Sequence, residues 1–149
     1  MYNISDNKSK QEAIKFLKQR GYKLISDDEV YTYDLRMKKG DKIVLIEVEH
    51  KRVWGGDDFP YPTVDVPYRK IKNEADIFIM FNNDYTVLFI TPMDTVKESP
   101  TSLKNTKYTK QERFFNIPLN KGKFIKNREI IGFSLYFANY KLQTSLRIE

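Results

Sequence analysis

Residues 42–51 have the sequence KIVLIEVEHK, in which a run of apolar residues leads into two carboxylates and a lysine. Such a β-branched run is apolar on both faces of a strand, which predicts a central position in a sheet. Since every second side chain of a strand points to the same face, we expect Glu47, Glu49 and Lys51 to lie together, with His50 on the opposite face. A carboxylate near the buried end of a strand is unfavourable without a partner, so this pattern indicates a binding site.

A further carboxylate precedes this strand. Residues 30–37 are strand-like and residues 38–41 (KKGD) predict a tight turn, so Asp34 is expected on the partner strand of a hairpin. Mg²⁺ binds hard oxygen ligands and keeps several waters or phosphate oxygens, and it therefore suits such a group of carboxylates. These residues favour a metal-dependent phosphodiesterase site. The alternative is a polar sheet face with cross-strand ion pairs, each worth roughly 0.2–1 kcal/mol.

Periodicity and turn residues predict the rest of the chain as an α/β sandwich with a mixed sheet. The predicted elements are a helix over 8–20 ended by Gly21, a strand over 23–26, an irregular loop over 52–68, a second helix over 68–74 and strands over 77–81 and 86–91. Residues 92–113 look loop-like, and residues 130–137 fit either a strand or a buried helix. We expect a single domain over 1–149, with its core at roughly 8–91 and a basic C-terminal extension over 92–149.

Length and composition fit one domain with a single core. The chain has 149 residues, including ten Tyr and ten Phe, and it contains no cysteine. The absence of cysteine excludes disulfides, a thiolate nucleophile and a zinc-finger-type site, and it is typical of a reducing, cytoplasmic setting in a bacterium or a phage-infected cell. No apolar run approaches the roughly 20 residues of a membrane-spanning helix, so no membrane association is expected.

The positive charge of the chain is concentrated in one segment. The net charge is +6, and residues 97–128 contain nine Lys or Arg against two Glu, interleaved with Tyr108 and three Phe. Basic side chains neutralise phosphates and aromatic rings stack on bases, which favours a nucleic-acid partner. Lys107 and Lys110 are the candidate contacts in this segment. The alternative is a solvated surface whose lysines only keep the protein in solution.

Together, the order of elements and the acidic residues resemble the PD-(D/E)xK, or restriction-endonuclease-like, nuclease superfamily. The resemblance covers residues 8–91, and Glu12-Ala13, Phe16-Leu17 and Gly21-Tyr22 are similar to the opening of Holliday-junction resolvases and related archaeal and phage nucleases. Asp34 matches the aspartate of the motif, although Tyr33 stands where the motif has proline. The resemblance implies a restriction-endonuclease-like sandwich with a mixed central sheet flanked by helices.

The resemblance also implies roles for the acidic residues. The expected ligands of Mg²⁺ or Mn²⁺ are Asp34, Glu47, Glu49 and, from the N-terminal helix, Glu12. Two registers remain open, because either Glu49-His50-Lys51 or Glu47-Val48-Glu49 can form the second half of the motif. In the first, Lys51 orients the attacking water and stabilises negative charge. In the second, Glu49 takes the position of the lysine and acts as a general base.

The function implied is a metal-dependent endonuclease that acts on DNA rather than RNA. A phage or mobile-element origin is expected. Cleavage of both strands of a duplex would favour a homodimer. Further candidate contacts to nucleic acid are Arg52 after the acidic strand, and Arg69 and Lys70 at the start of the predicted second helix, where plain solvent exposure is the alternative. Two other functions remain open. One is a nuclease fold that binds nucleic acid without cleaving it, and the other is a small α/β interaction protein with fortuitous acidic residues.

Overall fold

A mixed six-stranded sheet forms the centre of the fold in a computed structural model that describes residues 4–28, 30, 32–72 and 74–127. Its strand order is β1-β2-β3-β5-β6-β9, and a second sheet has the order β4-β8-β7. The helices and 3-10 turns are α1 (Ile4–Lys18), η1 (Tyr68–Lys72), α2 (Met93–Lys97) and η2 (Leu119–Lys121). The strands are β1 (Lys23–Ser26), β2 (Leu35–Lys39), β3 (Lys42–His50), β4 (Thr63–Pro67), β5 (Ile77–Phe81), β6 (Val87–Pro92), β7 (Thr101–Lys104), β8 (Glu112–Pro118) and β9 (Lys123–Lys126).

The first four elements follow from local sequence signals. The apolar stripe of α1 is buried, and the helix ends before Gly21, whose φ of 89° few residues other than glycine adopt readily. The hairpin of β2 and β3 turns through Gly40, with a φ of 61°. Strand β3 then pairs with β5 in parallel, which confirms the predicted central position of residues 42–49 in a mixed sheet.

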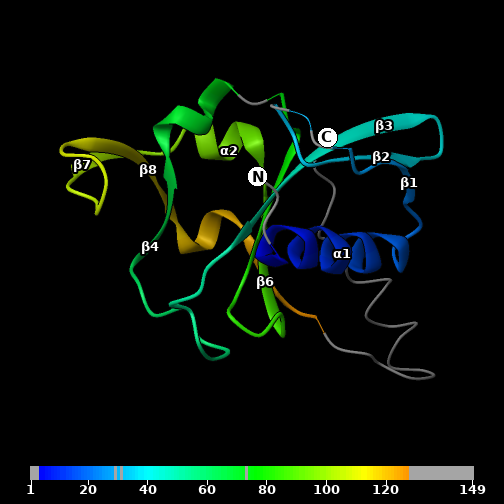
Figure 1. Ribbon diagram of the computed structural model, residues 1–149, viewed down its shortest axis with the longest axis horizontal. Coiled ribbons are helices and arrows are strands. Elements are labelled where there is room, and N and C mark those ends of the chain that lie inside the picture. The colour runs from blue at the N-terminus through cyan, green and yellow to red at the C-terminus, as the bar shows by residue number, and fades with distance from the viewer. Residues whose placement is uncertain (1–3, 29, 31, 73, 128–149) are drawn as a thin grey trace.

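Each face of the central sheet has its own apolar core. On one face, Phe16 and Leu17 of α1 pack with Ile46 of β3 and Ile79 of β5. On the other, Phe78 of β5 packs with residues of the second sheet and α2. Figure 1 shows this arrangement, with α1 on one side of the central strands and the β4–β8–β7 sheet on the other. The predicted sandwich with a mixed central sheet is confirmed.

Several predicted elements differ in the structure. The helix expected over 68–74 is the short 3-10 turn η1, whose Tyr68 ring packs on Phe115. The second face of the sheet is therefore covered mainly by strands, not by a second long helix. Strand β4 lies inside the segment predicted as an irregular loop over 52–68.

The segment after residue 91 contributes to the core. Residues 92–113, predicted to be loop-like, contain α2, β7 and the start of β8, and β9 extends the central sheet beside β6. Residues 130–137 lie outside the described residues, so the prediction for them stays open. No helix in the described part of the chain is both long and apolar enough to cross a membrane.

Candidate active site

The acidic residues of β3 face the second sheet. Ile46 and Val48 pack into the core beneath α1, so the alternation of the strand turns Glu47 and Glu49 to the opposite face. There they lie in register with Phe78 and Met80 of β5. Glu47 is 5% exposed, whereas Glu49, nearer the end of the strand, is only partly buried. The two carboxylates therefore occupy a buried and a more open position of one face, as the sequence predicts.

Asp34 is fixed against the same strand. Its amide donates to the Ile46 carbonyl over 2.9 Å, and its Oδ2 accepts a hydrogen bond from the Val48 amide at 2.7 Å. Strand β2 begins only at Leu35, so the prediction of a strand over 30–37 is wrong in its first half. The hydrogen bond from the Val48 amide to the Asp34 side chain extends the pairing with β3 by one residue beyond β2. This hydrogen bond holds the Asp34 carboxylate close to Glu47.

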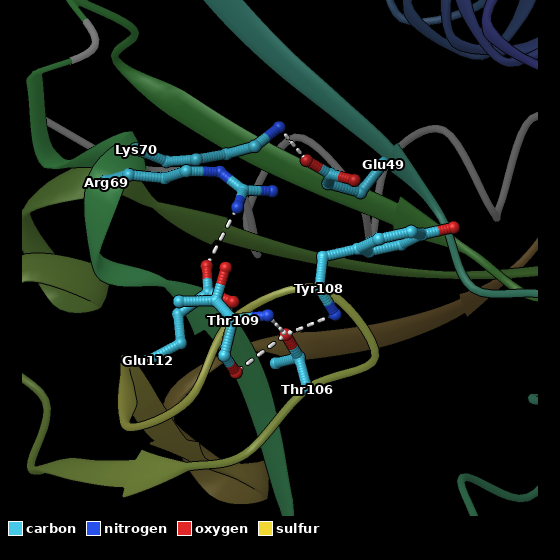
Figure 2. A network of polar contacts seen from close by, with 7 residues as sticks. All are labelled: Glu49, Arg69, Lys70, Thr106, Tyr108, Thr109 and Glu112. Carbon is cyan, nitrogen blue, oxygen red and sulfur yellow. Dashed lines mark hydrogen bonds and ion pairs between the residues drawn. The ribbon is translucent and has the colours of Figure 1, made fainter.

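Lys70 of η1 reaches into this group of carboxylates. Its Nζ lies 2.7 Å from Oε2 of Glu47 and also donates to Oε1 of Glu49. Figure 2 shows the lysine extending from η1 to Glu49, with its ammonium at the carboxylate. One ammonium thus bridges the two acidic residues of β3.

Negative charge exceeds positive charge in this cluster. Burial, followed by the charge of Asp34, raises the pKa of Glu47 from 4.5 to about 7, in spite of the opposing effect of Lys70. Burial lowers the pKa of Lys70, but Glu49 and Glu47 outweigh it and raise that pKa above its ordinary value. The ammonium of Lys70 pairs with Glu47 and Glu49, while the charge of Asp34 also acts on Glu47, which leaves Glu47 prone to hold a proton or to accept another cation.

The carboxylates of this cluster are suitable ligands for a hard divalent cation, although the described residues do not form a complete metal-binding site. In the described ranges, no three His, Cys, Asp or Glu side chains lie close enough together to hold a metal ion. Carboxylate oxygens are nevertheless the ligands that Mg²⁺ takes, usually one or two at a time, and the buried charge of Glu47 lacks full compensation. By chemical type, the carboxylates of Asp34, Glu47 and Glu49 suit such an ion, but the three are not gathered around one point.

Comparison with known proteins identifies the fold. The chain matches no family model and no curated protein sequence. It is similar to the structure of the bacterial homing endonuclease I-Ssp6803I, with a TM-score of 0.52 and 13% identity over 97% of this chain and 95% of that one. The chain has the restriction-endonuclease-like fold. The Holliday junction resolvase Hjc of Archaeoglobus fulgidus also matches, at a TM-score of 0.39 and 11% identity over 74% of this chain and 87% of that one.

In this restriction-endonuclease-like fold, Glu12 does not join the other acidic residues. Helix α1 packs on the opposite face of the central sheet from Glu47. Glu12 pairs there with Lys15 at 3.6 Å and accepts a hydrogen bond of 3.4 Å from Asn127. Glu12 lies on a helix, as the sequence predicts. However, this helix covers the face of the central sheet opposite to Glu47, so Glu12 is not beside the other carboxylates.

Lys51 lies at the edge of the site. Its amide bonds to the Phe81 carbonyl, and its ammonium lies 5.5 Å from the centre of the Tyr61 ring. Together with Glu49, it lines a pocket of about 210 Å³ between the two sheets. The pocket is lined by Glu49, His50, Lys51, Asp65, Val66, Pro67, Phe78, Met80 and Phe114. Lys51 is therefore near Glu49, whereas the ammonium bonded to the carboxylates belongs to Lys70.

The other predicted nucleic-acid contacts are spread over the surface. Arg52 is exposed in the turn after β3. Arg69 pairs with Glu112 of β8 at 2.8 Å, as Figure 2 shows. Lys107 and Lys110 are exposed in the loop between β7 and β8, where the Lys107 ammonium lies 5.6 Å from the centre of the Tyr108 ring. The structure leaves these predictions untested.

Sequence reasoning missed Asp65 and the pairing of Lys70. Asp65 of β4 accepts hydrogen bonds from Thr63, Lys104 and Asn116. Burial raises the pKa of Asp65, but the hydrogen bonds from Lys104, Asn116 and Thr63 outweigh it and bring that pKa below 3.8. The alternation of Val64, Asp65 and Val66 is the signal that could have identified this strand, although three nearby prolines obscured it.

Proposed function

We propose that this chain is a Mg²⁺- or Mn²⁺-dependent endonuclease that hydrolyses phosphodiester bonds of DNA. The observation that carries the proposal is the buried Glu47, whose charge is incompletely compensated between Asp34 and Glu49. The similarity in fold to a protein described as a homing endonuclease supports it. A carboxylate surplus of this kind is stable only when a proton or a cation occupies it, and a divalent cation beside a phosphate is the arrangement that nucleases use.

In this proposal, Asp34, Glu47 and Glu49 hold the divalent ion at the end of β3. The ion, when bound, supplies Lewis-acid stabilisation of the negative charge that develops on the phosphate. Lys51 lines the same pocket as Glu49 and can contact a phosphate oxygen with its ammonium. Glu49 is partly exposed, and it can accept a proton from the attacking water.

The DNA is expected to cross the opening between the two sheets. The pocket beside Glu49 lies there, and the β7–β8 hairpin carries Lys107 and Lys110 on an exposed loop. Exposed lysines of this kind contact the phosphate backbone without regard to sequence. Arg52, in the turn after β3, can add a contact on the side of the catalytic residues. Cleavage of both strands of a duplex would require a homodimer or two successive cuts.

The test is cleavage of supercoiled plasmid with Mg²⁺, with Mn²⁺ and with excess chelator. The variants are Asp34→Asn and Glu47→Gln, which keep the size of each side chain, and the control is Glu98→Gln, which removes an exposed carboxylate after α2. We expect metal-dependent nicking by the native protein and the control, and a loss of at least about a hundredfold in both site variants. Cleavage that survives in chelator or in both site variants would overturn the proposal.

A second candidate function is binding of nucleic acid without cleavage. It is favoured by the absence, within the described residues, of a group of three ligands already positioned for a metal, and by Lys70 bridging Glu47 and Glu49. The same experiment separates the two functions when an electrophoretic mobility assay is run beside it. DNA retained in a complex and recovered intact, at every metal concentration, would support the second function and contradict the first.

A further inference from the structure

The ammonium of Lys70 occupies a position among the carboxylates that a cation would take. It bonds to both Glu47 and Glu49, and the lysine side chain is 27% exposed. Glu47, in contrast, is buried, so water cannot stabilise the negative charge of its carboxylate. The lysine therefore acts as the counter-ion of two acidic residues that belong to another element of the fold.

The backbone just before Lys70 is anchored to the second sheet. The preceding Tyr68 ring stacks on Phe115 of β8, with centroids 5.1 Å apart, and Arg69 pairs with Glu112 of the same strand. These contacts tie η1 to the second sheet. A lysine has four rotatable carbons beyond this anchor, so its ammonium can leave the carboxylates while the turn stays in place.

We propose that Lys70 is an exchangeable internal cation: it compensates Glu47 and Glu49 in the resting protein, yields its position to a divalent ion, and then pairs with a phosphate of the substrate. This inference rests on the proposed function. The same ammonium cannot stay bonded to both carboxylates once their oxygens bind a metal, because the two cations would repel each other. A phosphate brought to the pocket offers the released ammonium a new partner, because Glu49, which Lys70 contacts, lines that pocket together with Lys51.

The exchange predicts opposite effects of one substitution on two measurements. Lys70→Gln removes the competing positive charge, so Mn²⁺ should bind more tightly, by about tenfold or more for a unit charge a few ångströms away. The same variant loses the ammonium that pairs with phosphate, so cleavage under saturating metal should fall. A lysine that only maintains the local structure would instead weaken metal binding when it is removed.

The test is calorimetric titration of Mn²⁺ into the native protein and its variants, in one buffer at the same pH for all of them. Lys104→Gln is the matched control, since Lys104 also pairs with a carboxylate that lines the pocket but bonds to neither Glu47 nor Glu49. Lys70→Arg keeps the charge and should bind Mn²⁺ no more tightly than the native protein. Tighter binding in Lys70→Gln alone supports the exchange, and unchanged or weaker binding overturns it.

A second measurement uses the unaltered protein and does not depend on the folding of a variant. Mg²⁺ should increase the rate at which an acetylating reagent labels the Lys70 amine, read by mass spectrometry, and should leave Lys104 unchanged. Constant or slower labelling of Lys70 would overturn the proposal. If the native protein binds Mn²⁺ and cleaves DNA in that case, only the exchange fails; if it neither binds Mn²⁺ nor cleaves, the proposed function fails with it.

Discussion

Glu47→Gln should make the protein more stable at alkaline pH, although it removes an ion pair. Glu47 is 5% exposed, and burial and the charge of Asp34 raise its pKa from 4.5 to about 7. The unfolded chain therefore releases this proton at a lower pH than the folded protein does. The free energy of unfolding of the native protein should fall as pH rises from the unfolded pKa to the folded one. Glutamine carries no titrating proton and should not show this loss.

The magnitude follows from the difference between the two pKa values. Each unit of pKa difference corresponds to about 1.4 kcal/mol, and part of the loss has already occurred at about pH 5. The expected change in the free energy of unfolding between about pH 5 and about pH 8.5 is therefore roughly 2–3 kcal/mol. At about pH 5 Glu47 is protonated in the folded native protein, so its hydrogen bond to Lys70 no longer joins opposite charges. The free energy of unfolding of Glu47→Gln should therefore be close to that of the native protein at this pH. At about pH 8.5 the variant should be the more stable protein by roughly that amount.

Urea denaturation followed by circular dichroism measures the effect, in metal-free buffer at the two pH values. The control is Glu98→Gln, which removes an exposed carboxylate, and its stability should follow that of the native protein. If Glu47→Gln and the native protein lose stability in parallel, Glu47 is ionised throughout this range, and the excess of negative charge inferred at the site does not exist.

Two further predictions concern the core and the basic hairpin. Gly122→Ala should destabilise the protein by about 1–3 kcal/mol in urea denaturation, because a Cβ there would lie 2.3 Å from a ring carbon of Phe89, whereas Gly55→Ala meets no atom within 4 Å and should change little. Equal stability of the two variants would contradict the packing around β9. Replacing Lys107 and Lys110 together by Gln should reduce the slope of log K for DNA binding against log salt by about 0.9 for each lost phosphate contact, as measured by fluorescence anisotropy. An unchanged slope would place the DNA elsewhere.

The acidic strand could be predicted from sequence because its signals are local. The apolar run Ile43–Ile46 marks a central strand, although Ile43 itself is exposed, and the period of two fixes which side Glu47 and Glu49 share. The structure adds that this side faces the second sheet and that Asp34 is held beside it by its hydrogen bond to the Val48 amide. The chemical roles of these residues remain predictions, which the cleavage assay addresses.

The partners of these residues could not be predicted in the same way. Lys70 meets Glu47 only because β4 and η1 return across the central sheet, which no local pattern encodes. Glu12 illustrates the same limit, since the sequence shows an amphipathic helix without showing which face of the sheet it covers. Strand β7 looked loop-like because most of it is exposed, so it has no buried apolar alternation to reveal it.

The parallel pairing of β3 with β5 decides which sheet carries each partner of the Lys70 ion pairs. The chain must cross over between two parallel strands, and this crossover contains β4 and η1. Lys70 therefore follows directly after a strand of the second sheet, whereas Glu47 and Glu49 belong to a strand of the central sheet. A transient separation of the two layers, detectable by amide hydrogen exchange in β4, would withdraw the lysine and leave both carboxylates on an intact strand.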